Sequence, residues 1–480
     1  MDLLAFEHHL DSPLGLGLLT DSEHRGSAGG AVCGDLIDFR VEVDPAGIIT
    51  CGFDAEGCGA LTAAGSAVAT LATSRHVLDA ALVGIDSVSE ELGGISAAKM
   101  HAVELAVDAY HRALGEAATT LSLEHVEGRK LVAMSGGVDS AVAAHLSGRA
   151  NSVGVTLELW RDGETDAAAS CCSHVAVRRA RDMAHEMGIP HFTLDLREEF
   201  RAGVVDPWLE GYRTGSTPNP CVQCNGRVRI APMVALADSL GAENLVTGHY
   251  ARVTHGDPDC PGHAVLQEGL HGAKEQAYAL SRVPQDVLDR LEFPLGHLAK
   301  TEVRAIASEQ KLAAAETPDS QDLCFLAGVG REAFLARHGG LTEKPGEIVD
   351  SDGKRLGIHR GIHHHTVGQR RGLGIGGGTP LYVTGTDAST NTVRVGSRSE
   401  ILTLEVRIED VDLKLPPARV NSARLRHHGD VGSAKLTMGS DGTGVLTFDS
   451  PMERVAPGQI ACLMDGELIV GCAAVAAAEA

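Results

Sequence analysis

The stretch Leu131-Val132-Ala133-Met134-Ser135-Gly136-Gly137-Val138-Asp139-Ser140 decides the fold of the central part of this chain. Its first four residues are apolar, two glycines follow, and the apolar run Ala141–Leu146 continues beyond it. This order predicts a strand, a glycine turn and a helix. The backbone N–H groups at the start of such a helix, close to glycines, favour a bound phosphate. No Gly-Lys-Ser/Thr follows the turn, so the loop is not a Walker A motif. An ordinary turn without a ligand is the alternative.

Similar apolar runs alternate with amphipathic stretches over residues 129–250, which is typical of a parallel sheet with crossover helices. Ligands of such sheets bind at the carboxyl ends of the strands, where Leu157 and Gly248 also fall. The expected strands and helices are, in order, Lys130–Met134, Ser152–Leu157, His191–Leu194 and Asn244–Thr247, then Val175–Met187 and Ile230–Leu240.

Three other blocks and a linker surround this sheet, so we expect a multidomain α/β protein. Residues 1–115 combine strand-like runs with later helical ones, which predicts a small α+β domain, and residues 116–128 are expected to be a linker. Residues 251–340 mix a hairpin-like section with helices and are expected to form a small central domain. Residues 341–480 are rich in glycine and in short alternating runs, which favours a C-terminal β-barrel.

Composition limits the classes of function. The 480 residues suffice for roughly three domains, and 43% hydrophobic residues are typical of a globular chain. No apolar run reaches the ~20 residues that span a bilayer, and the first residues lack a basic stretch, so we expect a cytoplasmic protein with no membrane partner. The net charge of −23 argues against a general nucleic-acid binder. Because the acidity is concentrated in residues 1–115, an RNA-binding surface elsewhere is not excluded.

Eleven cysteines in a chain of this length indicate sulfur chemistry or metal binding more than a disulfide framework. Cys221 and Cys224 are spaced C-x-x-C in a loop that Pro218 and Pro220 make rigid, and Cys324 follows another turn-rich stretch. The spacing alone leaves three alternatives open, which are a structural zinc pair, a redox pair and simply buried cysteines.

The glycine turn resembles the pyrophosphate loop (PP-loop) of the ATP pyrophosphatase superfamily, whose members cleave ATP between the α and β phosphates to adenylate a substrate. Further strings follow it in one order, and the series resembles the MnmA family of bacterial tRNA-specific 2-thiouridylases over residues 129–475. The strings are Ser135–Ser140, Asn219-Pro220-x-x-x-Cys224-Asn225, Thr247–Arg252, Lys274–Tyr278, Gln321–Phe325, Thr366–Gly374 and Pro457–Gln459.

This resemblance implies a reaction in two halves. ATP adenylates the C2 oxygen of the wobble uridine in a tRNA anticodon, and a sulfur nucleophile then displaces AMP, because adenylation makes a poor leaving group a good one. Mg²⁺ neutralises the phosphates, and Asp139 is its expected partner. Cys224 and Cys324 match the sulfur-handling pair, and with Asp139 they are the expected catalytic residues. The positions that match ATP contacts are Ala133, Met134, Ser135, Gly136, Gly137, Val138, Asp139, Ser140, Leu157 and Gly248.

Cys221 departs from the family pattern, since many members carry Asp there. We therefore expect Cys221, Cys224 and Cys324 to hold a [4Fe–4S] cluster with one iron open for sulfide. In the alternative, Cys324 carries a persulfide, Cys224 releases the product by closing a disulfide with Cys324, and Cys221 takes no part. A cysteine desulfurase or a sulfur carrier is the expected donor.

The resemblance also implies contacts with tRNA. Asn219, Pro220 and Cys221 are expected to line the uridine, whose base must leave its stack to reach ATP. A solvated surface residue is the alternative for each of the other tRNA positions. These are His249, Lys274, Glu275, Gln276, Arg426, His427 and Gln459.

Residues 1–115 resemble a different family, the iron–sulfur scaffolds of the IscU, SufU and NifU type. The matching strings are Gly29–Asp35, Gly57–Ala60 and Lys99–His101. The family's third cysteine would fall at Ala102 and is missing, so a docking domain for a cysteine desulfurase without a metal is the alternative to zinc or an iron–sulfur cluster. The expected ligands are Cys33, Asp35, Cys58 and His101.

Two other functions stay open at this point. In the first, the chain is an iron–sulfur or sulfur carrier whose C-terminal part only binds tRNA or ATP, although the intact Ser135–Ser140 string argues against it. In the second, it is a PP-loop enzyme that modifies a different tRNA base, which the Asn219–Asn225 and Gln321–Phe325 strings disfavour.

Overall fold

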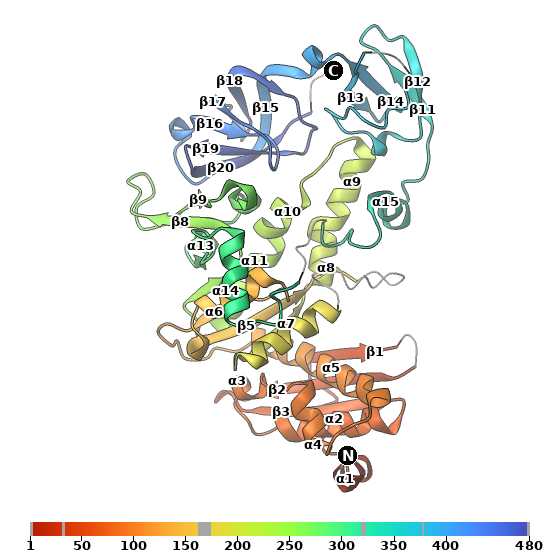
Figure 1. Cartoon of the computed structure of the whole chain (residues 1–480), viewed down its shortest axis with the longest axis vertical. Helices are drawn as coiled ribbons and strands as arrows, with labels where there is room; N and C mark the ends of the chain where they lie inside the picture. Colours follow the sequence, from red (N-terminus) through yellow and green to blue (C-terminus); the bar gives the residue numbers. More distant parts are fainter. Residues whose placement is uncertain (1–2, 31–33, 162–173, 318–322, 377–378, 478–480) are drawn as a thin grey trace. The chain divides into compact units, whose positions relative to one another are not determined.

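The computed structural model describes residues 3–30, 34–161, 174–317, 323–376 and 379–477 (Figure 1). The chain forms two compact units and passes between them several times. The first unit holds residues 1–197, 231–248 and 290–325, and the second holds residues 198–230, 249–289 and 326–480. Over the described ranges, none of the helices has the length and apolar character needed to cross a bilayer.

The first unit contains a five-stranded sheet in which every neighbouring pair is parallel. The expected fold class is confirmed here, and all four expected strands are present. The fifth strand has only two residues, too few for a periodicity to reveal. The strands in spatial order are β10 (Leu291–Glu292), β7 (Asn244–Val246), β4 (Lys130–Ala133), β5 (Ser152–Glu158) and β6 (His191–Asp195). The associated helices are α6 (Val138–Leu146), α7 (His174–Glu186), α11 (Ile230–Ser239) and α14 (Lys300–Glu309).

Among the five strands of this sheet, β4 comes first in the sequence, and it lies between β5 and β7. The chain therefore winds outward from β4 in both directions, which creates a switch point at its carboxyl end. Open parallel sheets bind their ligands at such points.

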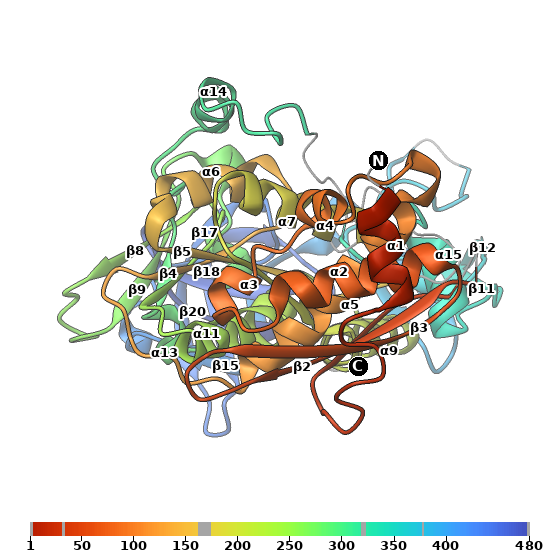
Figure 2. The same cartoon turned by 90° about the horizontal axis from the view of Figure 1, so that it is seen from below.

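The N-terminal domain belongs to the same unit and is an antiparallel sheet covered by helices (Figure 2). Phe39, Phe53 and Tyr110 are fully buried and pack ring against ring between the sheet and the longest helix. The strands are β1 (Arg25–Gly29), β2 (Leu36–Val43) and β3 (Ile49–Glu56). The helices are α1 (Leu3–Asp11), α2 (Gly59–Ala72), α3 (Val77–Ala80), α4 (Ile85–Glu91) and α5 (Met100–Thr119).

Helix α5 continues into the segment 116–128 that was expected to be a linker. Ala117 and Ala118 extend its buried stripe, so packing holds the helix through Thr119. The residues after it also lie against the sheet domain, since Leu123 N donates to Ser239 O at 2.9 Å and Val126 N donates to Gly241 O at 3.0 Å. The connection between the two domains of this unit is therefore held to the sheet domain by backbone hydrogen bonds.

Helix α5 packs on β6, the edge strand of the parallel sheet. A Cβ at Gly115 would lie 1.9 Å from Thr193 O, so only glycine lets the helix approach the strand this closely. The backbone N–H of His191 donates to Ala81 O at 3.2 Å. The N-terminal domain thus covers a sheet edge that would otherwise expose unpaired backbone groups.

The second unit has two separate β-bodies, whereas a single barrel was expected over 341–480. One is a closed six-stranded barrel, in which β15 pairs with both β18 and β20. The other is a four-stranded sheet with its own buried residues, among them Ile348, Val383 and Val393. The alternating runs indicated β-structure in this region, but alternation does not say which strands pair, because pairing depends on distant residues.

The barrel order is β15 (Leu402–Leu413), β18 (Gly444–Glu453), β17 (Val431–Met438), β16 (Ser422–Arg424), β19 (Ile460–Asp465) and β20 (Leu468–Val475), and β9 (Ala264–Glu268) and β8 (Ala251–His255) extend it from β20. The four-stranded order is β12 (Arg355–His359), β11 (Gly346–Val349), β14 (Thr392–Gly396) and β13 (Tyr382–Asp387). Further helices are α8 (Arg197–Phe200), α9 (Asp206–Thr214), α10 (Pro220–Gln223), α12 (Ala277–Leu280), α13 (Gln285–Leu288) and α15 (Arg331–Gly339).

Candidate active site

The loop between β4 and α6 has the geometry of a phosphate-binding turn. Gly137 is the N-cap of α6, and Ser140 Oγ accepts from Ser135 N at 3.1 Å and donates to Gly137 O at 3.0 Å. Gly136 has φ +72°, and a Cβ there would lie 2.8 Å from Ala176 O. Glycine is therefore required at Gly136 for both its backbone angle and its surroundings. The side chain of Ser140 holds the turn in shape without a ligand.

The other predicted ATP positions of the first unit lie around this loop. Ala133 ends strand β4 and Met134 follows it, and Met134 N donates to Val155 O of the neighbouring strand at 2.8 Å. Leu157 is buried near the end of β5. Gly248 follows β7, and a Cβ there would lie 3.0 Å from Ser140 N. The structure thus gathers these residues at the carboxyl ends of β4, β5 and β7.

Asp139 in the first turn of α6 forms an ion pair with Lys300, the first residue of α14. Lys300 Nζ lies 2.7 Å from Oδ1 and 2.8 Å from Oδ2 of Asp139. The Asp139 side chain is 34% exposed and that of Lys300 is 15% exposed. The carboxylate expected to meet Mg²⁺ therefore already has a cation beside it.

The predicted cysteine loop lies in the second unit. Asn219 caps α10, where its Oδ1 accepts from Cys221 N at 3.0 Å and from Val222 N at 3.2 Å. Pro220 occupies the first helical position, which suits its fixed φ. Cys221 is exposed and Cys224 is buried. The cap and the proline thus fix the short helix that carries Cys221 and ends at Cys224.

Two segments that are distant in the sequence form hydrogen bonds with this loop. Gln459 Nε2 donates to Thr217 O at 2.5 Å, and Thr217 N donates to Pro457 O at 2.8 Å. Tyr278 OH donates to Ile460 O at 2.8 Å, and the Asn219 side chain is hydrogen-bonded to Tyr278. Residues 217–221 are therefore held by residues that follow them by more than fifty positions.

The predicted tRNA positions differ in exposure. Arg426 and His427 are exposed, whereas Lys274 is half-buried. Glu275 is buried and pairs with Arg424 at 3.0 Å. Burial raises the pKa of Glu275, although the N–H of Ala277 and the charge of Arg424 oppose this.

Gln276 and His249 are partly buried. Gln276 Oε1 accepts from Tyr250 N at 3.0 Å, and Gln276 N donates to Tyr250 O at 2.9 Å. Burial, and then the nearby Arg229, lower the pKa of His249 to about 3. His249 is thus neutral at physiological pH and suited to hydrogen bonding instead of charge attraction.

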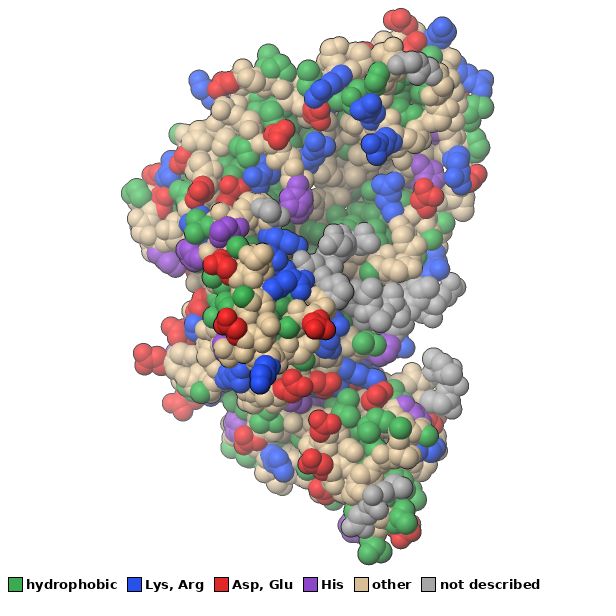
Figure 3. All heavy atoms as spheres, in the orientation of Figure 1, with side chains coloured by type: hydrophobic (Ala, Val, Ile, Leu, Met, Phe, Trp, Pro, Cys, Tyr) green, Lys and Arg blue, Asp and Glu red, His purple; other side chains and the backbone are tan. Residues whose placement is uncertain are grey.

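Positive side chains are frequent over the β-domains of the second unit on the face drawn in Figure 3. The exposed arginines of these domains include Arg370, Arg371, Arg394, Arg398 and Arg426. The net negative charge of the chain is thus compatible with an anionic ligand at this unit.

Cys324 belongs to the first unit, unlike Cys221 and Cys224. It is partly exposed, in a turn that precedes the buried Phe325. Gln321 and Asp322 of the same string lie outside the described residues.

In the N-terminal domain, three of the four predicted metal ligands come together. Donor atoms of Asp35, Cys58 and His101 all lie within 4.8 Å of one another. Asp35 Oδ2 lies 3.3 Å from both Cys58 Sγ and His101 Nε2, and its Oδ1 accepts from Cys58 N at 3.0 Å. Burial alone would raise the pKa of Asp35, but these hydrogen bonds hold it below its ordinary value. Cys33, the fourth predicted ligand, lies outside the described residues, and Ala102 is buried beside His101.

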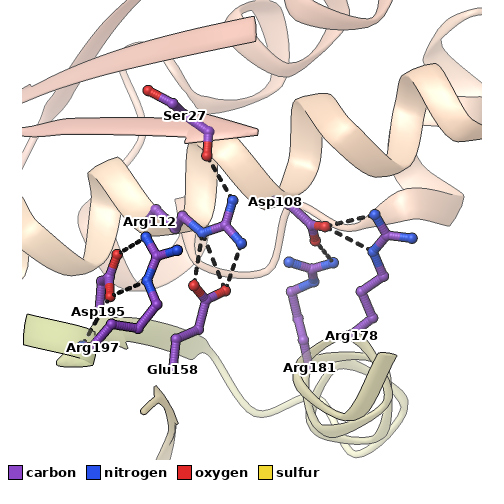
Figure 4. Close-up of polar contacts among 8 residues, drawn as sticks. All are labelled: Ser27, Asp108, Arg112, Glu158, Arg178, Arg181, Asp195 and Arg197. Carbon is purple, nitrogen blue, oxygen red and sulfur yellow. Dashed lines mark hydrogen bonds and ion pairs between the residues drawn. The ribbon is translucent and has the colours of Figure 1, made fainter. Parts of the chain in front are cut away.

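A charged network joins this domain to the parallel sheet (Figure 4). Arg112 on α5 donates to both carboxylate oxygens of Glu158 at 2.7 to 3.1 Å and to Ser27 O at 2.6 Å. Asp108 accepts from Arg178 at 2.8 Å and from Arg181 at 2.9 Å. These charges are nearly enclosed. The exposed fraction of the side chain is 12% for Arg112, 8% for Glu158, 8% for Asp108 and 1% for Arg181.

Sequence reasoning missed Lys300 and this network. The spacing of Asp108 and Arg112 within the alanine-rich stripe of α5 was a usable signal, because a charge on a buried face needs a partner. Lys300 shares a helical face with the buried Val303 and Ala307, which was a similar signal. No local pattern names their partners.

Four family descriptions match successive parts of the chain. They are a NifU-like N-terminal domain over residues 5–120, a "tRNA methyl transferase HUP domain" over 129–328, a "tRNA methyl transferase PRC-barrel domain" over 332–397 and an "aminomethyltransferase beta-barrel domain" over 414–475. The last two correspond to the two β-bodies of the second unit.

The chain is 40% identical to the bifunctional protein NifU/MnmA of Rubrobacter xylanophilus, over 96% of each chain. It is also 38% identical to the tRNA-specific 2-thiouridylase MnmA of Acetivibrio thermocellus, over 71% of this chain and 97% of that one. A third relative, the MnmA of Methylobacterium radiotolerans, is 41% identical over 69% of this chain and 88% of its own length. The chain therefore belongs to the family in which a NifU-like domain is fused to an MnmA-type protein.

Proposed function

We propose that this chain replaces the C2 oxygen of the wobble uridine of tRNA by sulfur, with ATP as the activating substrate. The observation that carries the proposal is the preformed loop at the β4 switch point, in a chain whose relatives are named 2-thiouridylases. A carrier protein has no need of such a loop. The order of strings downstream favours a uridine C2 oxygen over another acceptor.

The loop binds the phosphates, and the sheet holds the nucleoside. Backbone N–H groups of residues 136–138 and the start of α6 attract the polyphosphate, while Leu157 and Gly248 border the adenosine. Asp139 offers hard carboxylate oxygens beside the loop, which suits Mg²⁺, and the ion would neutralise phosphate charge there. The uridine oxygen attacks the α-phosphorus, the bond to the bridging oxygen breaks, and pyrophosphate leaves with that electron pair.

The thiols carry out the second half. The outer sulfur of a persulfide on Cys324 attacks C2, and AMP leaves with the C2 oxygen. The Cys224 thiolate then attacks the Cys324 sulfur, which releases 2-thiouridine and closes a disulfide between the two cysteines. The two thiols supply the electrons that reduce the sulfane sulfur, so a thiol reductant must open the disulfide before the next turnover.

The [4Fe–4S] cluster is the second route for sulfur. The i,i+3 spacing of Cys221 and Cys224 places both thiols on one side of the α10 turn, which suits two ligands of one cluster. Cys324 would be the third ligand, and the cluster would supply sulfide at its open iron. The exposed thiol of Cys221 is needed in this route and idle in the persulfide route.

The N-terminal domain is proposed to collect sulfur or iron–sulfur units from a cysteine desulfurase. Asp35, Cys58 and His101 offer the oxygen, sulfur and nitrogen donors that zinc accepts, at a spacing that one ion can bridge. A bound ion would keep Cys58 as a thiolate.

A matched set of serine variants at Cys221, Cys224 and Cys324 tests the sulfur step under anaerobic conditions. All three variants are expected to lose thiolation if a cluster is used, together with bound iron and labile sulfide. Only the Cys224 and Cys324 variants are expected to lose it in the persulfide route. Full thiolation by the Cys324→Ser protein would contradict both routes.

A further inference from the structure

Two cations border the phosphate loop, and neither has a role in the steps above. One is Lys300, whose Nζ lies 2.7 and 2.8 Å from the Asp139 carboxylate oxygens. The other is Arg179 of α7, since a Cβ at Gly136 would lie 3.0 Å from its Nε. Both therefore reach the turn that receives the polyphosphate.

Lys300 is held in place by its helix. It is the first residue of α14, which packs against α6 and buries Val303 and Ala307 on the same face. The N-terminus of α14 is closed by Glu302, whose Oε2 accepts from Ala299 N at 2.7 Å. With 15% of its side chain exposed, Lys300 has given up most of the water that a surface lysine keeps. A desolvated ammonium needs anions, and Asp139 supplies one here.

Arg179 contributes a second, independent observation. Its Nε is buried without a hydrogen-bond partner among the described residues. A buried guanidinium N–H without a hydrogen-bond acceptor is unfavourable unless a ligand supplies that acceptor. The Nε lies beside Gly136 in the phosphate-binding turn, because a Cβ built on that glycine would be 3.0 Å from it.

We propose that Lys300 and Arg179 bind the β and γ phosphates of ATP, and that Lys300 is a catalytic residue that stabilises the departing pyrophosphate. This inference rests on the proposed function, because it assigns residues to its adenylation step. Without nucleotide, the ammonium of Lys300 neutralises Asp139. With ATP and Mg²⁺ bound, Asp139 would share its charge with the ion, and the ammonium of Lys300 would meet the phosphate oxygens, where negative charge grows as the bond to the α-phosphorus breaks. No proton transfer is needed, since pyrophosphate leaves as an anion.

Four variants test this proposal through tRNA-dependent release of AMP and pyrophosphate from ATP. Lys300→Met is expected to lower kcat for AMP formation about 10²- to 10³-fold, and Lys300→Arg to restore part of it. Arg179→Met is expected to raise KM for ATP. In both methionine variants, added pyrophosphate should inhibit the reaction at least about tenfold more weakly, which corresponds to a loss of about 1.4 kcal/mol or more in the binding free energy of that product.

Lys130→Met is the matched control. Lys130 is the first residue of β4, whereas the phosphate loop follows the last residue of that strand. It pairs with Glu292 at 2.5 Å, so this variant removes a lysine–carboxylate pair at the end of the strand away from the loop. It should leave AMP formation and pyrophosphate inhibition unchanged.

AMP formation and pyrophosphate inhibition in Lys300→Met equal to those of the Lys130→Met protein would overturn the inference. If the unaltered protein released no AMP in the presence of tRNA, the proposed function itself would fail instead.

Discussion

The two ends of helix α5 serve different tasks. At its start, His101 joins Asp35 and Cys58 in a partly exposed group of metal-binding donors. Two to three turns later, Asp108 and Arg112 enter an enclosed network with arginines and a glutamate of the sheet domain (Figure 4). The same helix thus carries a site open to a ligand and a surface closed against a neighbouring domain. The NifU-like domain thus contacts the sheet domain through buried charged side chains of α5.

The largest expected effect is that acid pH lowers the stability of the interface between α5 and the sheet domain. His111, His185 and His191 meet at the interface, with ring centroids 5.8 and 6.3 Å from that of His111. Burial lowers all three pKa values, to about 4 for His185, and Arg181 lowers them further.

The unfolded chain therefore binds more protons below pH 6.5, the ordinary value of histidine. The stability of the interface is complete above pH 6.5 and should fall as the pH drops towards 4. Hydrogen exchange of α5 and β6 across this range measures the effect, and His185→Gln should flatten it. Unchanged protection at pH 4.5 would contradict the account. Asp108 stays charged in this window, because Arg181 and Arg178 hold its pKa below the ordinary value although burial opposes them.

Removing Asp108 is the next largest change. Asp108→Ala leaves Arg178 and Arg181 without their buried partner and should lower the free energy of unfolding by about 3–5 kcal/mol. Glu104→Ala is the control, since Glu104 pairs with the same Arg178 but is 34% exposed, and it should lower that free energy by less than about 1 kcal/mol. Denaturant unfolding followed by hydrogen exchange of α5 compares the two. Equal losses would show that burial does not set the strength of this network.

A smaller effect is expected from Arg112→Lys. Lysine keeps the charge but cannot donate to both oxygens of Glu158 and to Ser27 O at once, so about 1–3 kcal/mol should be lost. A double-mutant cycle with Glu158→Gln measures the pairwise part of the interaction. A coupling free energy near zero would mean that packing alone holds the domains.

At the start of α5, the group formed by Asp35, Cys58 and His101 should show the opposite behaviour, with a small effect on stability and a large effect on metal binding. Cys58→Ala is expected to change the unfolding free energy of the metal-free protein by less than about 1 kcal/mol, because its side chain is partly exposed. It should nevertheless abolish tight zinc binding, which calorimetry measures against Cys51→Ala, a change in the buried core of β3. Zinc affinity that is equal in Cys58→Ala and in the unaltered protein would exclude the Asp35 group as the metal site.

The same contrast explains what the sequence could predict. The ligands Asp35, Cys58 and His101 and the loop Ser135–Ser140 are short strings with known chemistry, and the structure brings the members of each together. The β4–β7 strands followed from apolar runs of the right length.

Such patterns did not predict which distant residues contact one another. Arg112 and Glu158 are 46 residues apart, Lys300 and Asp139 are 161 apart, and Gln459 and Thr217 are 242 apart. These contacts depend on how whole elements pack, as does the division of residues 341–480 into two β-bodies. Some of these residues carry a local signal, but no local pattern identifies the distant residue with which each one pairs.

Mass spectrometry of nucleosides tests the central claim most directly. Unmodified tRNA is incubated with the purified full chain, ATP, Mg²⁺, a cysteine desulfurase with cysteine, and a thiol reductant, then digested to nucleosides. We predict a wobble uridine heavier by the exchange of one oxygen for sulfur, formed with equimolar AMP and absent when ATP is omitted or Asp139 is replaced by alanine. Uridine that keeps its mass in the complete reaction, or thiolation that proceeds without ATP, would contradict the account.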